Sequence, residues 1–184
     1  MRLFIATPIS RQVETELANI IYQLKNVAGN IKWVKPENIH LTIKFLGDTD
    51  ESLVEHLSEI IDETSRETDI LEFRISKLGG FPNLIRPRAL WAGLDGDHAE
   101  LERLASSVDK RVYELGYEKE TRKFRPHLTL GRVKKPQALP QLAHFIENYK
   151  IEAMPFQIDR LTLFKSTLTP RGPIYERIHE ALFK

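Results

Sequence analysis

Two short phrases of the sequence combine a histidine and a threonine at the same spacing. The phrase HLTI occupies positions 40–43 and the phrase HLTL occupies positions 127–130, so both read His-x-Thr-apolar. Side chains on a β-strand alternate between its two faces, so each histidine shares a face with its threonine while each leucine points the other way. Each phrase therefore predicts a polar pair on an apolar strand.

Displacement at phosphorus is the chemistry that suits two such pairs. Of two facing imidazoles, one can be neutral and accept a proton while the other is protonated and donates one. A threonine two residues along lies roughly 6 to 7 Å from its histidine's Cα and can donate a hydrogen bond to a phosphoryl oxygen. In-line displacement needs a base, an acid and donors to the equatorial oxygens. The candidate catalytic residues are His40, Thr42, His127 and Thr129.

Other chemistries fit the residues less well. Zinc needs three or four ligands, whereas the two histidines lie 87 residues apart with no carboxylate beside them at ligand spacing. The sequence has no cysteine, no P-loop and no dinucleotide-binding glycine motif. We therefore expect neither a metal ion nor a cofactor.

Length and composition are typical of a globular protein. At 184 residues and 41% hydrophobic content, the chain is long enough for one large domain or two closely packed lobes. No run of about 18 apolar residues occurs, and the start of the sequence is apolar for only a few positions before Pro8. We therefore expect no membrane span and no signal peptide, and a cytoplasmic setting.

Hydrophobic periodicity predicts strands that alternate with helices, without a low-complexity linker. Strands are expected at 2–7, 31–35, 39–46, 70–78, 88–94, 127–133, 154–165 and 173–182. Helices are expected at 11–27, 51–66, 98–115 and 137–148, and a turn is expected at 79–82.

The spacing of the two phrases indicates an internal duplication, because 87 residues are close to half the chain. Two similar lobes related by a pseudo-twofold axis would face their phrase strands across a cleft, a plausible active site. We expect one domain over residues 1–184, with lobes at about 1–85 and 86–184 and with strand exchange between the lobes allowed.

The net charge of +1 hides an uneven distribution. Between positions 119 and 135, seven lysines and arginines oppose only Glu120, which makes this window +6 and leaves −5 elsewhere. A charge run is often only a solvated face. Here it surrounds the second phrase, which favours a polyanion such as RNA as the partner over a neutral metabolite.

Longer stretches around the phrases resemble the 2H phosphoesterase superfamily. They are PENIHLTIKFLGD, FRPHLTLGRV, GGFPN at 79–83, RALWAGL at 88–94 and LFKSTLTPRGPIY at 163–175. Within that superfamily they resemble the bacterial and archaeal RNA 2′,3′-cyclic phosphodiesterases, also called 2′-5′ RNA ligases. The resemblance covers nearly the whole chain. It implies a bilobal α+β fold in which two antiparallel sheets line a central groove, with helices outside.

The resemblance also implies a reaction and residue roles. A 2′,3′-cyclic phosphate at an RNA end would be hydrolysed to a 2′-phosphomonoester, with His40 as proton donor to the leaving 3′-oxygen and His127 as the base. Thr42 and Thr129 would bind the phosphate, and Arg132 would contact the phosphate or the nucleotide. The same apparatus would join a cyclic phosphate end to a 5′-hydroxyl end, for example of tRNA halves, through a 2′-5′ linkage.

Four further residues are weaker candidates for substrate binding, each with an ordinary structural alternative. Phe45 faces away from His40 by simple alternation, so it is a core residue unless its strand bulges. Arg125 binds phosphate or caps a turn. Lys165 and Tyr175 line the groove, or are a solvated lysine and a core tyrosine. Core positions are the favoured reading of both tryptophans.

Two other functions remain open from the sequence. The protein could be an RNA-end-binding module whose histidines only position the phosphate, without turnover. It could instead keep the two-histidine chemistry but act on a small cyclic nucleotide or an ADP-ribose cyclic phosphate. In each case we expect a monomer.

Overall fold

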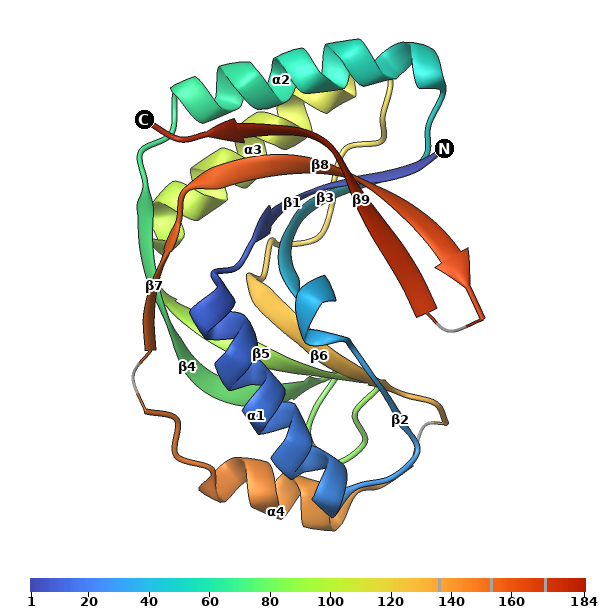
Figure 1. Ribbon diagram of the computed structural model, residues 1–184, viewed down its shortest axis with the longest axis vertical. Coiled ribbons are helices and arrows are strands. Elements are labelled where there is room, and N and C mark those ends of the chain that lie inside the picture. Colours follow the sequence, from blue (N-terminus) through green and yellow to red (C-terminus); the bar gives the residue numbers. More distant parts are fainter. Residues whose placement is uncertain (136, 153, 171) are drawn as a thin grey trace.

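A curled antiparallel sheet runs through the molecule, with two pairs of helices packed at its opposite ends (Figure 1). The computed structural model describes residues 1–135, 137–152, 154–170 and 172–184. The described strands are β1 (Arg2–Pro8), β2 (Ile31–Trp33), β3 (His40–Asp48), β4 (Leu71–Phe81), β5 (Ala89–Gly96), β6 (His127–Val133), β7 (Met154–Ile158), β8 (Arg160–Thr169) and β9 (Gly172–Leu182). The described helices are α1 (Arg11–Val27), α2 (Val54–Arg66), α3 (His98–Glu114) and α4 (Pro140–Asn148).

The expected α+β class is confirmed, and the strand order shows how the two halves of the chain combine. In the described residues the order is β7-β4-β5-β6-β3-β1-β8-β9, with β2 paired to β6. Helices α2 and α3 pack together over the β8–β9 end, whereas α1 and α4 contact each other at the far end (Figure 1). No helix in these described ranges is long and apolar enough to cross a membrane.

One register pair joins the two ends of the sheet. Leu41 of β3 pairs with Leu128 of β6, and no other pair is formed between these strands in the described chain. The two expected sheets are therefore linked into one. The leucines hold equivalent positions in the two His-x-Thr phrases, and equivalent residues meet where a two-fold axis relates two segments. Both leucines are fully buried, as strand alternation predicts.

Strands from both sequence halves contribute to each end of the sheet. β8 pairs with β1, and β7 pairs with β4. The boundary expected near residue 85 falls between β4 and β5, which are hydrogen-bonded neighbours. We propose that the chain forms one domain whose lobes exchange strands.

The helices follow their apolar stripes closely. The stripe of α1 is buried from Val13 to Leu24, and the Ser10 side chain accepts a hydrogen bond from the Val13 amide at the helix start. The helix expected at 51–66 begins with a 3₁₀ turn at Glu51–Leu53 before α2. The helix expected at 137–148 starts only at Pro140, a residue whose fixed φ suits the first helical position.

Two local predictions are wrong. Residues 79–81 of the turn expected at 79–82 are part of β4, which continues through Phe81 in register with β5 and ends before Pro82. Gly79 is needed there because a Cβ would overlap the Trp91 ring, so the glycines serve close packing rather than a turn. The strand expected at 154–165 is broken between Ile158 and Arg160, and its two parts lie at opposite ends of the sheet.

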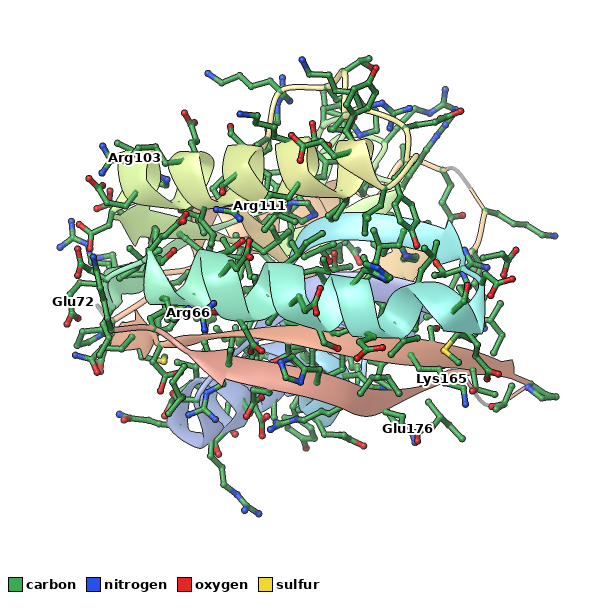
Figure 2. The ribbon with its side chains drawn as sticks, turned by 90° about the horizontal axis from the view of Figure 1, so that it is seen from above. Arg66, Glu72, Arg103, Arg111, Lys165 and Glu176 are labelled. Atoms are coloured by element: carbon green, nitrogen blue, oxygen red, sulfur yellow. The ribbon has the colours of Figure 1, made fainter. Side chains whose placement is uncertain are left out.

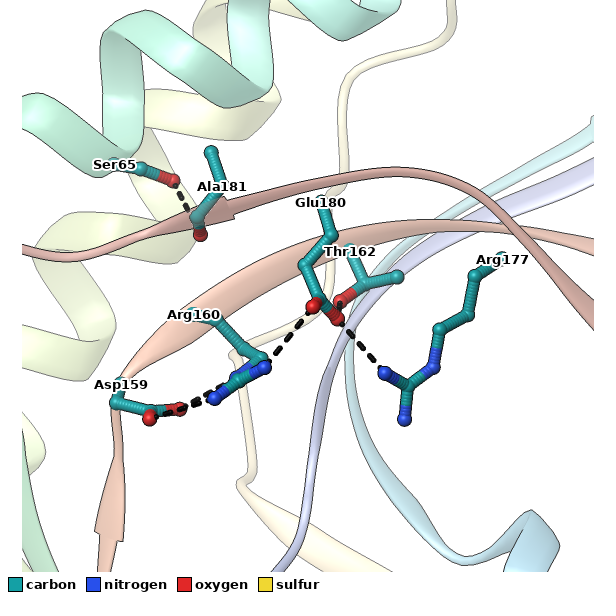
Figure 3. Close-up of polar contacts among 7 residues, drawn as sticks. All are labelled: Ser65, Asp159, Arg160, Thr162, Arg177, Glu180 and Ala181. Carbon is teal, nitrogen blue, oxygen red and sulfur yellow. Dashed lines mark hydrogen bonds and ion pairs between the residues drawn. The ribbon is translucent and has the colours of Figure 1, made fainter.

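A polar cluster fixes the β8–β9 hairpin, which forms one wall of the cavity described below (Figure 3). Arg160 donates to Asp159 at 2.8 Å and to Glu180 at 3.0 Å. Glu180 also accepts hydrogen bonds from Thr162 at 2.9 Å and Arg177 at 3.2 Å. Because Glu180 lies on β9 while Arg160 and Thr162 lie on β8, these contacts tie the two strands together.

Candidate active site

The two His-x-Thr phrases lie in one cavity of about 490 Å³. All four candidate catalytic side chains line it: His40, Thr42, His127 and Thr129. Aromatic and cationic side chains line it as well: Phe4, Trp33, Phe45, Tyr175, Arg2, Lys32, Lys35 and Arg132. The cavity therefore brings together residues that are 87 positions apart in the sequence.

The register explains why the four side chains meet. Leu41 pairs with Leu128, so the two phrases lie side by side in antiparallel directions at their central leucines. Residues directly opposite on antiparallel strands have Cα atoms roughly 4.5 to 5.5 Å apart. The histidine and the threonine that flank each leucine are thereby brought near the other phrase, and all four side chains line the cavity.

Both imidazole rings are held in the same way by the backbone. His40 Nδ1 lies 2.8 Å from the Asn38 carbonyl oxygen, and His127 Nδ1 lies 2.6 Å from the Arg125 carbonyl oxygen. A carbonyl only accepts, so each Nδ1 carries the hydrogen. The nitrogen left for chemistry is Nε2 in both rings. In a neutral ring Nε2 accepts a proton, and in a protonated ring it donates one.

The surroundings of the two histidines differ. His40 packs beside Phe4, with ring centroids 4.8 Å apart, and meets the edge of Tyr175 at 5.3 Å. Burial lowers the pKa of His40, against the opposing effect of the hydrogen bond to the Asn38 carbonyl. His127 contacts Phe81 edge to face at 5.1 Å. The aromatic pocket around His40 therefore favours its neutral form in the free protein.

The pKa of His40 is expected to respond to an anion in the cavity. In the free protein, its NMR titration midpoint should fall below the ordinary histidine value, since burial penalises the charged ring. Inorganic phosphate bound beside it should raise the midpoint, because an opposite charge favours the imidazolium. A His40 midpoint unmoved by saturating phosphate would contradict this account.

A bulge turns Phe45 toward the cavity. The pairing of β1 with β3 runs Ile5–Lys44 and then Ala6–Thr42, so Ile43 is skipped. Ile43 and Lys44 are consequently both buried, and the alternation resumes in the opposite phase. Phe45 lines the cavity and is 69% exposed. The core position that simple alternation favours is therefore wrong for Phe45.

The reversed alternation buries Lys44, and the charge of its ammonium group is paired with a carboxylate. Its ammonium group lies 2.6 Å from an Asp109 carboxylate oxygen on α3 and donates to the Glu118 carbonyl at 2.7 Å. A buried charge is stable only when it is paired and hydrogen-bonded. These contacts hold the bulge in place behind the cavity.

The second phrase strand bulges at the equivalent position. The pairing of β5 with β6 runs Leu90–Gly131 and then Trp91–Thr129, so Leu130 is skipped. Arg132 is thereby exposed and lines the cavity, on the side of Thr129. Phe45 and Arg132 each stand five residues after their histidine, so the two bulges are equivalent.

Gly131 within the second bulge allows a close approach of Trp33. A Cβ at Gly131 would lie 2.9 Å from Trp33 Cε3 and 2.9 Å from Ile31 Cγ2. Trp33 is half-buried and lines the cavity, rather than lying in the core as the sequence favours. Trp91 is also only half-buried, although it packs against Phe81 with ring centroids 5.2 Å apart.

Of the remaining residues predicted to bind substrate, one lines the cavity and two lie outside its lining. Tyr175 lines the cavity, and burial raises the pKa of its hydroxyl. The Lys165 side chain lies outside the cavity lining and forms an exposed ion pair with Glu176 at 3.6 Å (Figure 2). Arg125 is exposed and outside the lining too, and it contributes its backbone carbonyl to His127.

The sequence reasoning missed Asn38. Its carbonyl holds the His40 ring, and its side-chain amide donates to the Pro173 carbonyl of the β8–β9 hairpin at 3.1 Å. Asn38 therefore connects a wall of the cavity to the orientation of His40. Its place two residues before the first histidine, like that of Arg125 before the second, was the available signal.

The charged side chains described in the cavity lining all have the same sign. Among the described residues, four cationic side chains line it and no carboxylate does. The described chain also contains no cluster of three or more histidine, aspartate or glutamate residues arranged to hold a metal ion. This arrangement suits an anionic ligand.

A curled antiparallel sheet that carries two equivalent His-x-Thr strands over one cavity defines the 2H phosphoesterase fold. A family model described as LigT like Phosphoesterase matches residues 8–91 and 94–175, each stretch containing one phrase. The chain belongs to this family.

Relatives and solved structures agree with that assignment. The RNA 2′,3′-cyclic phosphodiesterase of Methanocaldococcus jannaschii is 38% identical, over 98% of this chain and 99% of its own length. The protein of that name from Thermotoga maritima is 32% identical, over 100% and 96%. A Thermus thermophilus protein superposes with a TM-score of 0.82 at 24% identity, covering 100% of this chain and 98% of its own. Escherichia coli LigT with 3′-AMP gives 0.76 at 19%, covering 99% and 97%.

Proposed function

We propose that the protein hydrolyses 2′,3′-cyclic phosphate ends of RNA to 2′-phosphomonoesters. The observation that carries the proposal is the single cavity that both histidines and both threonines line, together with four cationic side chains. The name shared by the relatives, RNA 2′,3′-cyclic phosphodiesterase, supports the same substrate class.

In the proposed reaction, the two histidines act from opposite sides of the phosphorus. His127 Nε2 takes a proton from a water molecule, whose oxygen forms a bond to phosphorus. The bond from phosphorus to the 3′-oxygen breaks, and His40 Nε2 gives its proton to that oxygen. The hydroxyls of Thr42 and Thr129 donate to the nonbridging oxygens and stabilise the charge that develops there. The 2′-oxygen keeps the phosphate.

The backbone contacts of the rings support these roles. The Arg125 carbonyl fixes the hydrogen of His127 on Nδ1, which leaves the Nε2 lone pair that a base requires. His40 needs a second proton on Nε2 to act as an acid, and its burial opposes this. The anionic cyclic phosphate offsets that burial by favouring the imidazolium beside it. The binding of substrate and the protonation of His40 are thus coupled.

The proposal includes ligation by the same groups. When the 5′-hydroxyl of a second RNA takes the place of water, its oxygen bonds to phosphorus as the 3′-oxygen departs. The product is a 2′-5′ linkage, and tRNA halves are one class of RNA with suitable ends. We propose a cytoplasmic monomer that carries out both reactions without a metal ion or a cofactor.

Arg132 and Arg125 provide a matched test of the binding site. Arg132→Ala is expected to lower kcat/KM by about 10- to 100-fold, the value of a charge-assisted contact to phosphate. Arg125→Ala should stay within about twofold of the wild type, because its contact to His127 comes from the backbone. The measurement is the steady-state hydrolysis of an RNA 2′,3′-cyclic phosphate. Equal losses in the two variants would contradict the different roles that their positions indicate.

Product analysis tests the proposed function itself. The protein is incubated, with a chelator present, with an RNA oligonucleotide that ends in a 2′,3′-cyclic phosphate, and the product is compared with 2′- and 3′-phosphate standards. Formation of the 2′-phosphomonoester is expected. A 3′-phosphate product, binding without turnover, or turnover of small cyclic nucleotides alone would overturn the proposal.

A further inference from the structure

The cavity carries more positive charge than one cyclic phosphate requires. A cyclic phosphate diester has a single negative charge, and the two threonines and two histidines already supply its donors. Arg2, Lys32, Lys35 and Arg132 add four cations, and none of them pairs with a carboxylate in the parts of the chain that the structure describes. This surplus indicates that the cavity takes a ligand with more than one anionic group.

Two of these cations lie side by side at a definite place. Lys32 of β2 is the register partner of Arg132 of β6, so their Cα atoms lie roughly 4.5 to 5.5 Å apart. Both side chains line the cavity. The backbone pairing thus fixes a lysine beside an arginine on the rim.

This cationic pair is offset from the reacting centre along β6. Thr129 precedes Arg132 by three residues, which span roughly 7 to 10 Å of a strand that bulges between them. Thr129 holds the reacting phosphate in the proposed mechanism. Lys32, beside Arg132 on the neighbouring strand β2, is therefore placed for an anion next to that phosphate rather than for the phosphate itself.

We infer that Lys32, together with Arg132, binds the second phosphate of the RNA chain, the one attached to the 5′-oxygen of the terminal nucleoside. The inference rests on the proposed function and specifies its substrate. A terminal nucleoside carries the cyclic phosphate on its 2′ and 3′ oxygens and the next phosphate on its 5′ carbon, so the two groups are one nucleoside apart. A lysine ammonium is a point charge well suited to such a phosphate.

Two substrates that differ by one phosphate test this subsite. They are adenosine 2′,3′-cyclic phosphate and the same compound with a 5′-phosphate. For the wild type, kcat/KM should be about fivefold higher for the 5′-phosphorylated compound, the scale of one exposed charge pair. Lys32→Gln should bring this ratio close to one, and Lys32→Arg should preserve it. Lys110→Gln, which removes an exposed lysine from α3 outside the cavity lining, should leave the ratio unchanged.

Salt dependence gives a second readout. The substrate is an RNA oligonucleotide that ends in a cyclic phosphate, and log kcat/KM is plotted against the logarithm of the salt concentration. The slope is negative, and it should be less steep for Lys32→Gln than for Lys110→Gln, by about one. A Lys32→Gln variant that loses activity equally on both adenosine compounds, or a wild type with a ratio of one, would overturn the subsite alone. Failure of the wild type to hydrolyse any of these cyclic phosphates would overturn the proposed function as well.

Discussion

Replacement of His40 or His127 by alanine is expected to lower kcat for RNA 2′,3′-cyclic phosphate hydrolysis by about 10²- to 10⁴-fold in each variant. This is the range that positioned general acids and bases contribute. Each ring presents only Nε2 to the substrate, since its Nδ1 is engaged by a backbone carbonyl. Among the described residues that line the cavity, no other group replaces an imidazole as acid or base near neutral pH. The measurement is single-turnover hydrolysis.

The fold should survive both replacements. His40 packs against Phe4 and His127 against Phe81, so alanine removes ring contacts but no core leucine. Circular dichroism and thermal unfolding check this. His56→Ala, which changes an exposed histidine of α2, is the matched control and should retain wild-type turnover. Wild-type rates in both active-site variants would show that the histidines do not carry the chemistry.

Replacement of Thr42 or Thr129 by valine should have the second largest effect, a loss of about 10²-fold in kcat. Valine keeps the shape of threonine and removes only the hydroxyl, so the change isolates one hydrogen bond to a nonbridging oxygen. Loss of a single donor of this kind typically costs about 10²- to 10³-fold. The fall should appear in kcat more than in KM, because the bond strengthens as charge develops in the transition state.

Steady-state kinetics of the two valine variants provide the test. Thr15→Val on the exposed face of α1 is the control for the same chemical change and should not alter kcat. If either cavity variant raised KM and left kcat unchanged, that threonine would bind ground state and transition state equally. Its role as a transition-state donor would then be wrong.

The polar pairs of the two His-x-Thr phrases were predictable because their signal is local. Alternation on a strand is enough to place His40 with Thr42 and His127 with Thr129, and to bury the leucine between them. Both ends of helix α1 were likewise predictable, because its apolar stripe, the Ser10 cap at its start and the residues at its C-terminal end all indicate the same bounds. These features depend on residues that are neighbours in the sequence.

The bulges were not predictable from the same pattern. Ile43 and Lys44 in β3, and Leu130 and Gly131 in β6, are consecutive buried residues that reverse the alternation. A lysine is an improbable buried residue until its partner is known, and Asp109 comes from a helix 65 positions later. The orientation of Phe45 depended on this distant contact.

The pairing of Lys32 with Arg132 could not be predicted from the sequence, for a similar reason. Lys32 and Arg132 meet through the pairing of β2 with β6, strands separated by about half the chain. Sequence reasoning found Arg132 by resemblance and the basic window by counting, but the structure places the predicted binding residues Lys165 and Arg125 outside the lining. Cross-strand neighbours are set by topology, which a single sequence states only indirectly.

The central claim is that two similar histidines act in opposite protonation states, and pH–rate profiles test it most directly. The wild-type kcat/KM should be bell-shaped, because hydrolysis requires one imidazole to be neutral and the other to be protonated. In His127→Ala the low-pH limb should disappear, and in His40→Ala the high-pH limb should disappear. Profiles that keep both limbs in each variant would contradict the account.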